Sequence, residues 1–147
     1  MVKNTNVLSR DFIIHPGETL KEILEDRGMS QRELAIRTGV TESHISSVVN
    51  CQKDIAVSFA KKLEYALDID AGFWINLQAN YDKELADFEE CNNVTEEEIE
   101  ILKKLKDIIK YLKNIGFVEK GARGSILVIQ LRKLLNISRL SRIPEIY

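Results

Sequence analysis

The segment that most constrains this chain of 147 residues runs from Ser30 to Asn50, where residue spacing predicts two short helices joined by a tight turn. Ser30 can cap the first helix, and Glu33, three residues later, can reach back to the N–H of the cap. Gly39 lies where the chain must turn with positive φ, a conformation that glycine adopts without a Cβ penalty. Thr41 can cap the second helix. Apolar residues at helical spacing are predicted to face inward: Leu34, Ala35, Val40, Ile45, Val48 and Val49.

The second of these helices keeps a polar outer face, which is typical of a rigidly held helix that reads DNA. The segment resembles the helix-turn-helix of phage-repressor-like (Xre/Cro-type) proteins. Two flanking motifs extend the resemblance to the HigA family of addiction-module antidotes, namely HPGETL at residues 15–20 and FWINLQANY at residues 73–81. The resemblance covers residues 13–88. It implies an all-α protein with a repressor-like five-helix domain over residues 10–90 and a helical extension over residues 95–147.

The outer face of the second helix supplies the expected base contacts, which are Glu42, Ser43, His44 and Ser47. In the repressor-like family long amides are frequent at such positions, whereas this chain carries hydroxyls and a carboxylate. A serine hydroxyl bonds to base edges but selects poorly among them, and a glutamate accepts from a cytosine amine while it repels phosphate. The docking mode is therefore expected with modest specificity. The alternative is that these residues form an ordinary solvated helix face.

The resemblance also implies contacts to the DNA backbone. Gln31 resembles the position that grips a phosphate together with the N–H groups at the start of a helix. Asn50 matches the residue that closes the reading helix, and because Cys51 replaces the glycine that usually follows, Asn50 itself is expected to adopt the left-handed cap. The full set of expected backbone contacts is Gln31, Arg32, Arg37, Thr41, Ser46, Asn50 and Lys53.

Further helices are predicted on both sides of this segment. One begins at Pro16 and ends at Gly28, and another, capped by Ser58, extends to Leu67. The Phe-Trp helix is predicted from residue 70 or 71 to about residue 85, with its aromatic residues in the core rather than on a stacking platform, and residues 87–93 are predicted as a linker. Thr95 is expected to cap one long helix that ends at Gly116, and a last helix is expected over residues 125–135.

The charge is unevenly distributed along the chain. Residues 1–50 carry six Lys/Arg and seven Asp/Glu, residues 51–94 carry four and nine, and residues 95–147 carry eleven and seven. A DNA-binding module usually has a basic footprint, which the first two segments lack. A homodimer on a palindromic operator doubles the number of cations, so we expect a dimer with its reading helices roughly 34 Å apart. The tail helices are expected to take part in this interface, and the alternative is that they form a hairpin against their own core.

Several classes of protein are excluded by what the sequence lacks. No apolar run approaches the roughly 20 residues that span a bilayer, and residues 1–9 lack the apolar core of a signal peptide. Two cysteines are too few for a disulfide framework, which favours a cytoplasmic protein. The two histidines, far apart, make a poor metal site, and we expect neither a metal nor a cofactor. No catalytic motif is found, so the chain is predicted not to be an enzyme.

These observations lead to two functional hypotheses. The first is a sequence-specific DNA-binding repressor, the antitoxin of a HigBA-type system, which regulates its own operon and neutralises a HigB-type ribonuclease toxin. The alternative is a protein-interaction or regulatory domain that kept the fold with weak or no DNA binding, such as the N-terminal part of an ImmA/IrrE-type zinc peptidase. The acidic core and the Ser-rich reading helix favour the alternative.

Overall fold

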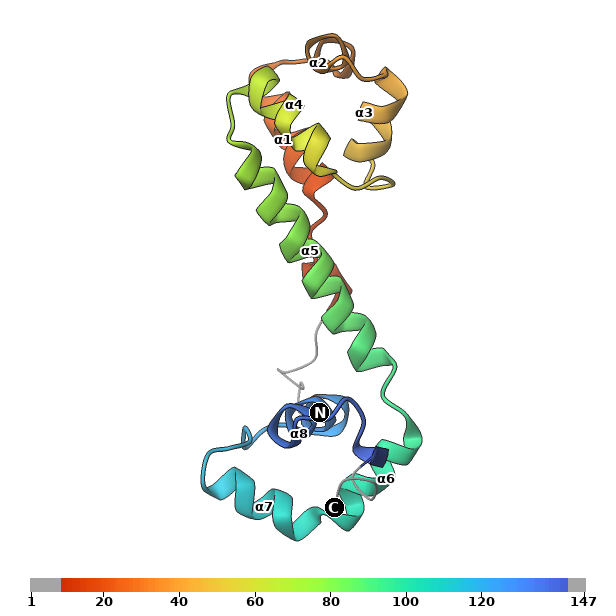
Figure 1. The fold of residues 1–147 in the computed structure, drawn as a ribbon, viewed down its shortest axis with the longest axis vertical. Helices are drawn as coiled ribbons and strands as arrows, with labels where there is room; N and C mark the ends of the chain where they lie inside the picture. Colours follow the sequence, from red (N-terminus) through yellow and green to blue (C-terminus); the bar gives the residue numbers. More distant parts are fainter. Residues whose placement is uncertain (1–8, 143–147) are drawn as a thin grey trace. The chain divides into compact units, whose positions relative to one another are not determined.

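A computed structural model describes residues 9–142, and within these residues the chain is all helical, as predicted (Figure 1). The helices are α1 (Pro16–Arg27), α2 (Gln31–Thr38), α3 (Glu42–Val49), α4 (Val57–Leu67), α5 (Ala71–Asn92), α6 (Glu96–Lys104), α7 (Lys106–Asn114) and α8 (Gly124–Leu135), with short 3-10 helices η1 (Arg10–Phe12) and η2 (Leu140–Arg142). Contacts divide the chain into a first unit, Arg10–Ala86, and a second unit from Asp87 onward. The expectation that residues 1–9 do not form a signal peptide concerns residues that, apart from Ser9, lie outside the described range.

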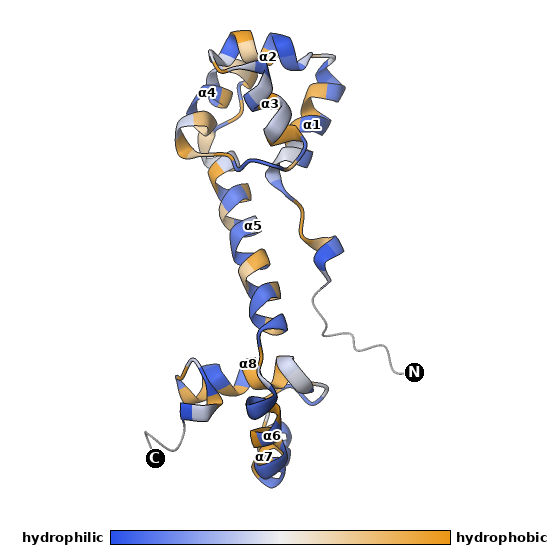
Figure 2. Cartoon of the chain, turned by 90° about the vertical axis from the view of Figure 1, so that its right-hand side faces the viewer, coloured by the Kyte–Doolittle hydropathy of each residue, from blue (hydrophilic) through white to orange (hydrophobic). Residues whose placement is uncertain are grey.

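The first unit contains η1, α1 to α4 and α5 up to Ala86, and its helices pack around one core (Figure 2). The core includes the apolar residues predicted at 34, 35, 45, 48 and 49, together with Leu20, Phe59, Leu63 and Trp74. Trp74 is completely buried, which confirms its predicted core position. Its neighbour Phe73 is 41% exposed, so the core prediction is wrong for that ring.

Local signals decide where the helices of the first unit begin and end. Pro16 opens α1, and Gly28 ends it at φ 63°, as predicted. The predicted cap at Ser58 is wrong, because α4 begins one residue earlier, at Val57, with no side-chain cap. The predicted linker at residues 87–93 is also wrong, because α5 continues to Asn92. Glutamate is a good helix former, so Glu89 and Glu90 are compatible with a helix that continues through this stretch.

The second unit has an apolar core of its own, formed by α6, α7, α8 and η2. Thr95 caps α6 as predicted, with its Oγ1 accepting the N–H of Glu98 at 3.3 Å. The prediction of one long helix up to Gly116 is wrong, because the helix is interrupted at Leu105, which has φ −97° and ψ 12°. Side chains of both resulting helices, such as Leu102 and Ile109, reach the core around α8. Tertiary packing thus overrides a continuous helical pattern.

A buried ion pair stabilises this second core. The carboxylate of Glu98, which is 1% exposed, accepts hydrogen bonds from Arg132 Nε at 3.0 Å and Nη2 at 2.5 Å. It also accepts the N–H of Leu140 at 3.0 Å. Burial by itself raises the pKa of Glu98, but the hydrogen bonds from Arg132 and Leu140 outweigh it and hold the pKa below its ordinary value. One carboxylate thereby joins α6, α8 and η2.

Candidate nucleic-acid interface

The two helices of the candidate interface, α2 and α3, are held by the predicted caps and turn. Ser30 Oγ accepts the N–H of Glu33 at 3.0 Å, and Thr41 Oγ1 accepts the N–H of His44 at 3.1 Å. Gly39 ends α2 in the left-handed conformation, with φ 73°. These three features set the angle between the helices from local chemistry alone.

The position of α3 in the first unit depends on a close approach to α1. A Cβ added to Gly17 would lie 1.9 Å from the carbonyl oxygen of Val48, so only a glycine fits there. His15, just before α1, caps that helix by accepting the N–H of Gly17 on Nδ1 at 2.9 Å. The HPG motif therefore fixes the position of α3 against α1. This role could not be inferred from the sequence alone.

The outer face of α3 carries three of the four predicted base contacts. Glu42 and Ser43 are exposed, and Ser47 is half-buried, with its Oγ donating to the carbonyl oxygen of Ser43 at 3.0 Å. A serine hydroxyl rotates readily, so Ser47 keeps the ability to hydrogen-bond to a base. The three residues form a small polar surface with one negative charge.

His44 does not point outward as expected. Its ring packs edge-to-face against Phe59 with 4.9 Å between the ring centroids, and its Nε2 is buried without a hydrogen-bond partner among the described residues. Burial lowers the pKa of His44, and the nearby Lys53 and Lys62 lower it further. Residue 44 lies one turn before the buried Val48 and borders the inner face of α3, so the expectation that its side chain points outward is wrong, while its base contact stays a prediction.

Of the three cations predicted to contact the DNA backbone, one is already paired with a carboxylate of its own helix. Arg37 is bound to the carboxylate of Glu33, with Nε at 3.1 Å and Nη2 at 2.9 Å. Arg32 and Lys53 are exposed, and neither forms an ion pair within residues 9–142. Gln31 is half-buried at the first position of α2, where the N–H groups of a helix start favour an anion.

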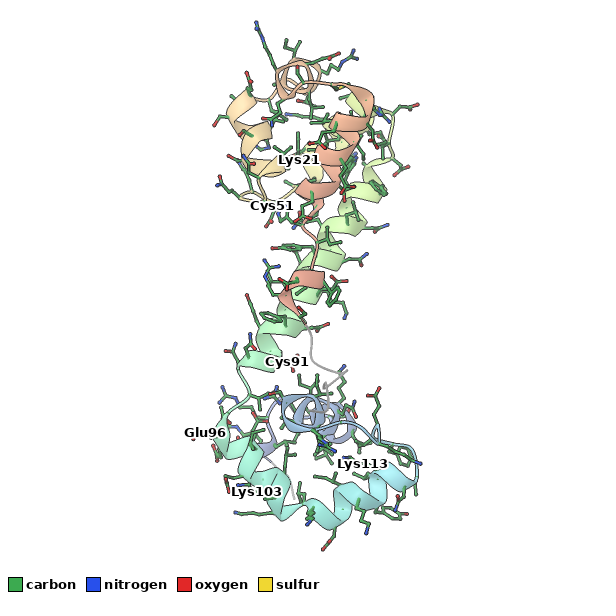
Figure 3. The ribbon with its side chains drawn as sticks, turned by 180° about the vertical axis from the view of Figure 1, so that it is seen from behind. Lys21, Cys51, Cys91, Glu96, Lys103 and Lys113 are labelled. Atoms are coloured by element: carbon green, nitrogen blue, oxygen red, sulfur yellow. The ribbon has the colours of Figure 1, made fainter. Side chains whose placement is uncertain are left out.

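Three polar residues complete the predicted set. Thr41 is engaged as the cap of α3, and Ser46 is half-buried and accepts the side-chain amide of Asn50 at 3.3 Å. The prediction that Asn50 takes the left-handed conformation is wrong, because Asn50 has φ −88°. The conformation falls on Cys51 instead, which has φ 61°. Figure 3 labels this residue, which follows α3 directly after Asn50. Cys51 thus occupies a backbone geometry that glycine adopts without strain.

The loop that follows α3 is tied to both ends of the first unit. Gln78 on α5 is buried, accepts the N–H of Ile55 at 2.9 Å and donates to Asp82 at 2.9 Å. His15 Nε2 lies 3.3 Å from Asp54 Oδ1. The two flanking sequence motifs therefore meet at the loop that carries Lys53, and sequence reasoning had assigned them no such role.

The described residues offer no competing site of two common kinds. No group of three His, Cys, Asp or Glu side chains within residues 9–142 could hold a metal ion. None of the helices described is both long enough and apolar enough to cross a membrane.

The fold and the site define a helix-turn-helix protein, and comparison with known proteins gives the same class. The model of the Helix-turn-helix family matches residues 20–74. Virulence-associated protein I of Dichelobacter nodosus is 37% identical over 75 residues, which are 50% of this chain and 69% of that protein. The chain belongs to the Xre-type helix-turn-helix family. This family is not an enzymatic one, which agrees with the prediction that the chain is not an enzyme.

Solved structures similar to the chain include HigA antitoxins. An addiction module antidote protein of the HigA family from Coxiella burnetii is 27% identical, with a TM-score of 0.47, and the match covers 67% of this chain and 92% of that one. A Pseudomonas aeruginosa protein in complex with its operator DNA is 33% identical, with a TM-score of 0.49, over 50% of this chain and 82% of that one. The helix-turn-helix part of the resemblance noted in the sequence is confirmed by the family match over residues 20–74.

Proposed function

We propose that the chain is a sequence-specific DNA-binding repressor that inserts α3 into the major groove of an operator. The observation that carries this proposal is the seating of α3, whose inner side is fixed by the core and by Gly17 while Glu42, Ser43 and Ser47 remain on its outer side. A helix held this firmly presents its polar side chains in one geometry, which base recognition requires.

The contacts divide into two kinds. Ser43 and Ser47 donate to or accept from base edges, and Glu42 accepts from a cytosine amine. Gln31 and the N–H groups at the start of α2 bind one phosphate, while Arg32 and Lys53 neutralise others. Arg37, Thr41, Ser46 and Asn50 support these contacts from the positions described above.

Homodimerisation on a palindrome is part of the proposal. Among the described residues, the exposed cations near α3 are few, namely Arg32, Lys53 and Lys62, and phosphate contacts dominate the affinity of proteins for DNA. Two subunits with their reading helices roughly 34 Å apart double this number and match two half-sites one helical turn apart.

The biological setting that we propose is a HigBA-type toxin–antitoxin system. In this setting the chain is the antitoxin, represses its own operon in the cytoplasm and neutralises a HigB-type ribonuclease toxin. The HPGETL and FWINLQANY motifs support this assignment, since residues of both motifs hold the α3 region in place here. Toxin binding then falls to another surface than the outer side of α3.

A second candidate function, a protein-interaction or regulatory domain with weak DNA binding, is favoured by the charges near α3. Glu33 neutralises Arg37, Glu42 places a carboxylate on the outer face, and His44 points inward. Weak affinity for any duplex at moderate salt is the expectation of this alternative.

The test is a mobility-shift assay at several salt concentrations, with DNA from upstream of the chain's own gene and a scrambled duplex of equal length. We expect Ser43→Ala and Ser47→Ala to reduce the preference for the upstream DNA, at about 1 kcal/mol each. Gln31→Ala is expected to weaken binding to both duplexes alike, and the exposed Ser58→Ala serves as a control without effect. Equal affinity of the unmodified protein for both duplexes at near-physiological salt would refute the repressor function.

A further inference from the structure

The second unit contains a hollow of about 730 Å³ that the proposed function does not use. Leu102, Ile109 and Leu127, one from each of α6, α7 and α8, form its floor, and all three also pack in the core of that unit. Four lysines line this lysine hollow: Lys106, Lys110, Lys113 and Lys120. Because the floor is the outer side of a core that is already packed, the charged groups determine which ligand the hollow attracts.

Three of the four lysines share one side of α7. Positions 106, 110 and 113 are four and three residues apart, and such positions are neighbours on a helix surface. They extend over about 10 Å, at roughly 1.5 Å per residue. Lys113 Nζ donates to the carbonyl oxygen of Ala122 at 3.0 Å, which holds one ammonium at the hollow (Figure 3). The exposed Ile108 and Tyr111 lie on the opposite side of α7, so the lysine side presents its charges without them.

The lysine hollow is positive because little within the unit neutralises it. Among the described residues that line it, Asp107 is the one acid. Within residues 9–142, no ion pair is formed by Lys106, Lys110 or Lys120. Several like charges around a concave surface raise the local potential and attract anions.

The distribution of charge along the chain favours DNA as that anion. Residues 1–50 and residues 51–94 each carry more Asp/Glu than Lys/Arg, whereas residues 95–147 carry eleven Lys/Arg and seven Asp/Glu. Few exposed cations lie near α3 among the described residues, although phosphate contacts dominate the affinity of proteins for DNA. The positive charge that is typical of a DNA-binding chain is thus found in the second unit.

We propose that the lysine hollow binds phosphates of duplex DNA without regard to base sequence. This inference rests on the proposed function for the identity of the duplex, and it assigns a second DNA contact to a unit without a reading helix. Two linked contacts on one chain reinforce each other, even where each is weak. A row of lysines about 10 Å long is longer than one phosphate group, and it matches several phosphates of one strand, which follow at about 3.4 Å along the helix axis.

The experiment measures the affinity of the full chain for the upstream duplex and for the scrambled duplex of equal length, at several salt concentrations. The test variant is Lys106→Gln/Lys110→Gln, in which glutamine keeps a similar helix propensity. For each lysine that contacts a phosphate, the slope of log K against log salt is expected to fall by about 0.9, which is about fivefold in affinity at about 0.15 M salt. The double variant should therefore lower the slope by about 1.8 per bound subunit, and equally for both duplexes.

The matched control is Lys103→Gln/Lys104→Gln, which removes two charges from the same unit but outside the hollow. Lys103 is already paired with Glu100, so this control should leave the slope nearly unchanged. An equal loss of slope in the control would show that net charge alone matters, and it would overturn the proposal. Circular dichroism of every variant separates a lost contact from a lost fold.

Arg32→Gln, in the first unit, keeps failure of this inference apart from failure of the proposed function. If Arg32→Gln lowers the slope and Lys106→Gln/Lys110→Gln does not, the first unit binds DNA and the lysine hollow does not. A double variant that keeps its slope but loses the calorimetric binding of inorganic pyrophosphate indicates a small-anion site, which also overturns the inference. Equal affinity of the unmodified protein for both duplexes, with a lowered slope in the double variant, contradicts the repressor function but supports the lysine hollow. Absence of any DNA binding overturns both.

Discussion

The close approach of α1 to α3 predicts that Gly17→Ala destabilises the first unit. The new Cβ would lie 1.9 Å from the oxygen and 2.9 Å from the carbon of the Val48 carbonyl, which are backbone atoms that no rotamer change can move. Ordinary contact requires about 3.5 Å, so α1 and α3 must separate by more than 1 Å. Overpacking of this kind costs about 3 kcal/mol, and the better helix propensity of alanine returns up to about 1 kcal/mol. The net expected loss is about 2 kcal/mol.

Urea unfolding, monitored by tryptophan fluorescence, measures this loss of unfolding free energy in the first unit. Trp74 is the single tryptophan of the chain and is completely buried in the first unit. Gly72→Ala is the matched control, because Gly72 is also the second residue of its helix and its added Cβ would meet only the flexible side chain of Asp70, at 2.9 Å. That control should lose no more than about 1 kcal/mol, the value of the Asp70 cap. If Gly17→Ala unfolds within about 0.5 kcal/mol of the unmodified protein, the contact does not seat α3 as we argue.

Three further predictions concern α5, the second unit and the assembly. Gln78→Leu should leave the Ile55 N–H unpaired and weaken binding to all duplexes, whereas the exposed Asn80→Leu should not, as mobility shifts can show. Glu98→Gln should destabilise the second unit by about 3 kcal/mol at pH 7, measured by amide exchange in α8. Because the folded pKa of Glu98 is lowered, its contribution is complete above the unfolded pKa of about 4.3 and is lost as the pH falls through the folded pKa, so the difference between the two proteins should shrink in acid. Sedimentation of the full chain at tens of micromolar should give a dimer, and a monomer would contradict that assembly.

The parts of the structure that local chemistry determines could be predicted from the sequence. The starts of α2, α3 and α6 follow from a serine or threonine whose oxygen accepts an N–H in the first turn, and the turn between α2 and α3 follows from Gly39. Each of these signals acts within four residues. Periodicity also predicts which residues of α3 face inward, apart from His44 at the border of that face.

The parts that long-range contacts determine could not be predicted. His44 borders the inner face of α3, and the ring of Phe59 on α4 draws it inward. The interruption at Leu105 depends on where α8 packs, and Glu98 pairs with an arginine 34 positions later. Periodicity assigns a residue to a face but does not identify its partner, so a charged residue at a helix start gives no sign that it will be buried.

The loop after α3 shows how the two flanking motifs, HPGETL and FWINLQANY, act together. His15 lies before α1 and Gln78 on α5, yet one is 3.3 Å from Asp54 and the other accepts the N–H of Ile55 at 2.9 Å. The edge-to-face contact of His15 with Tyr81, at 4.8 Å between centroids, links the same two motifs to each other. Lys53 therefore projects from a loop whose following residues are fixed from two sides. A cation on such a loop loses little conformational entropy when it binds a phosphate, which offsets in part the small number of cations beside α3.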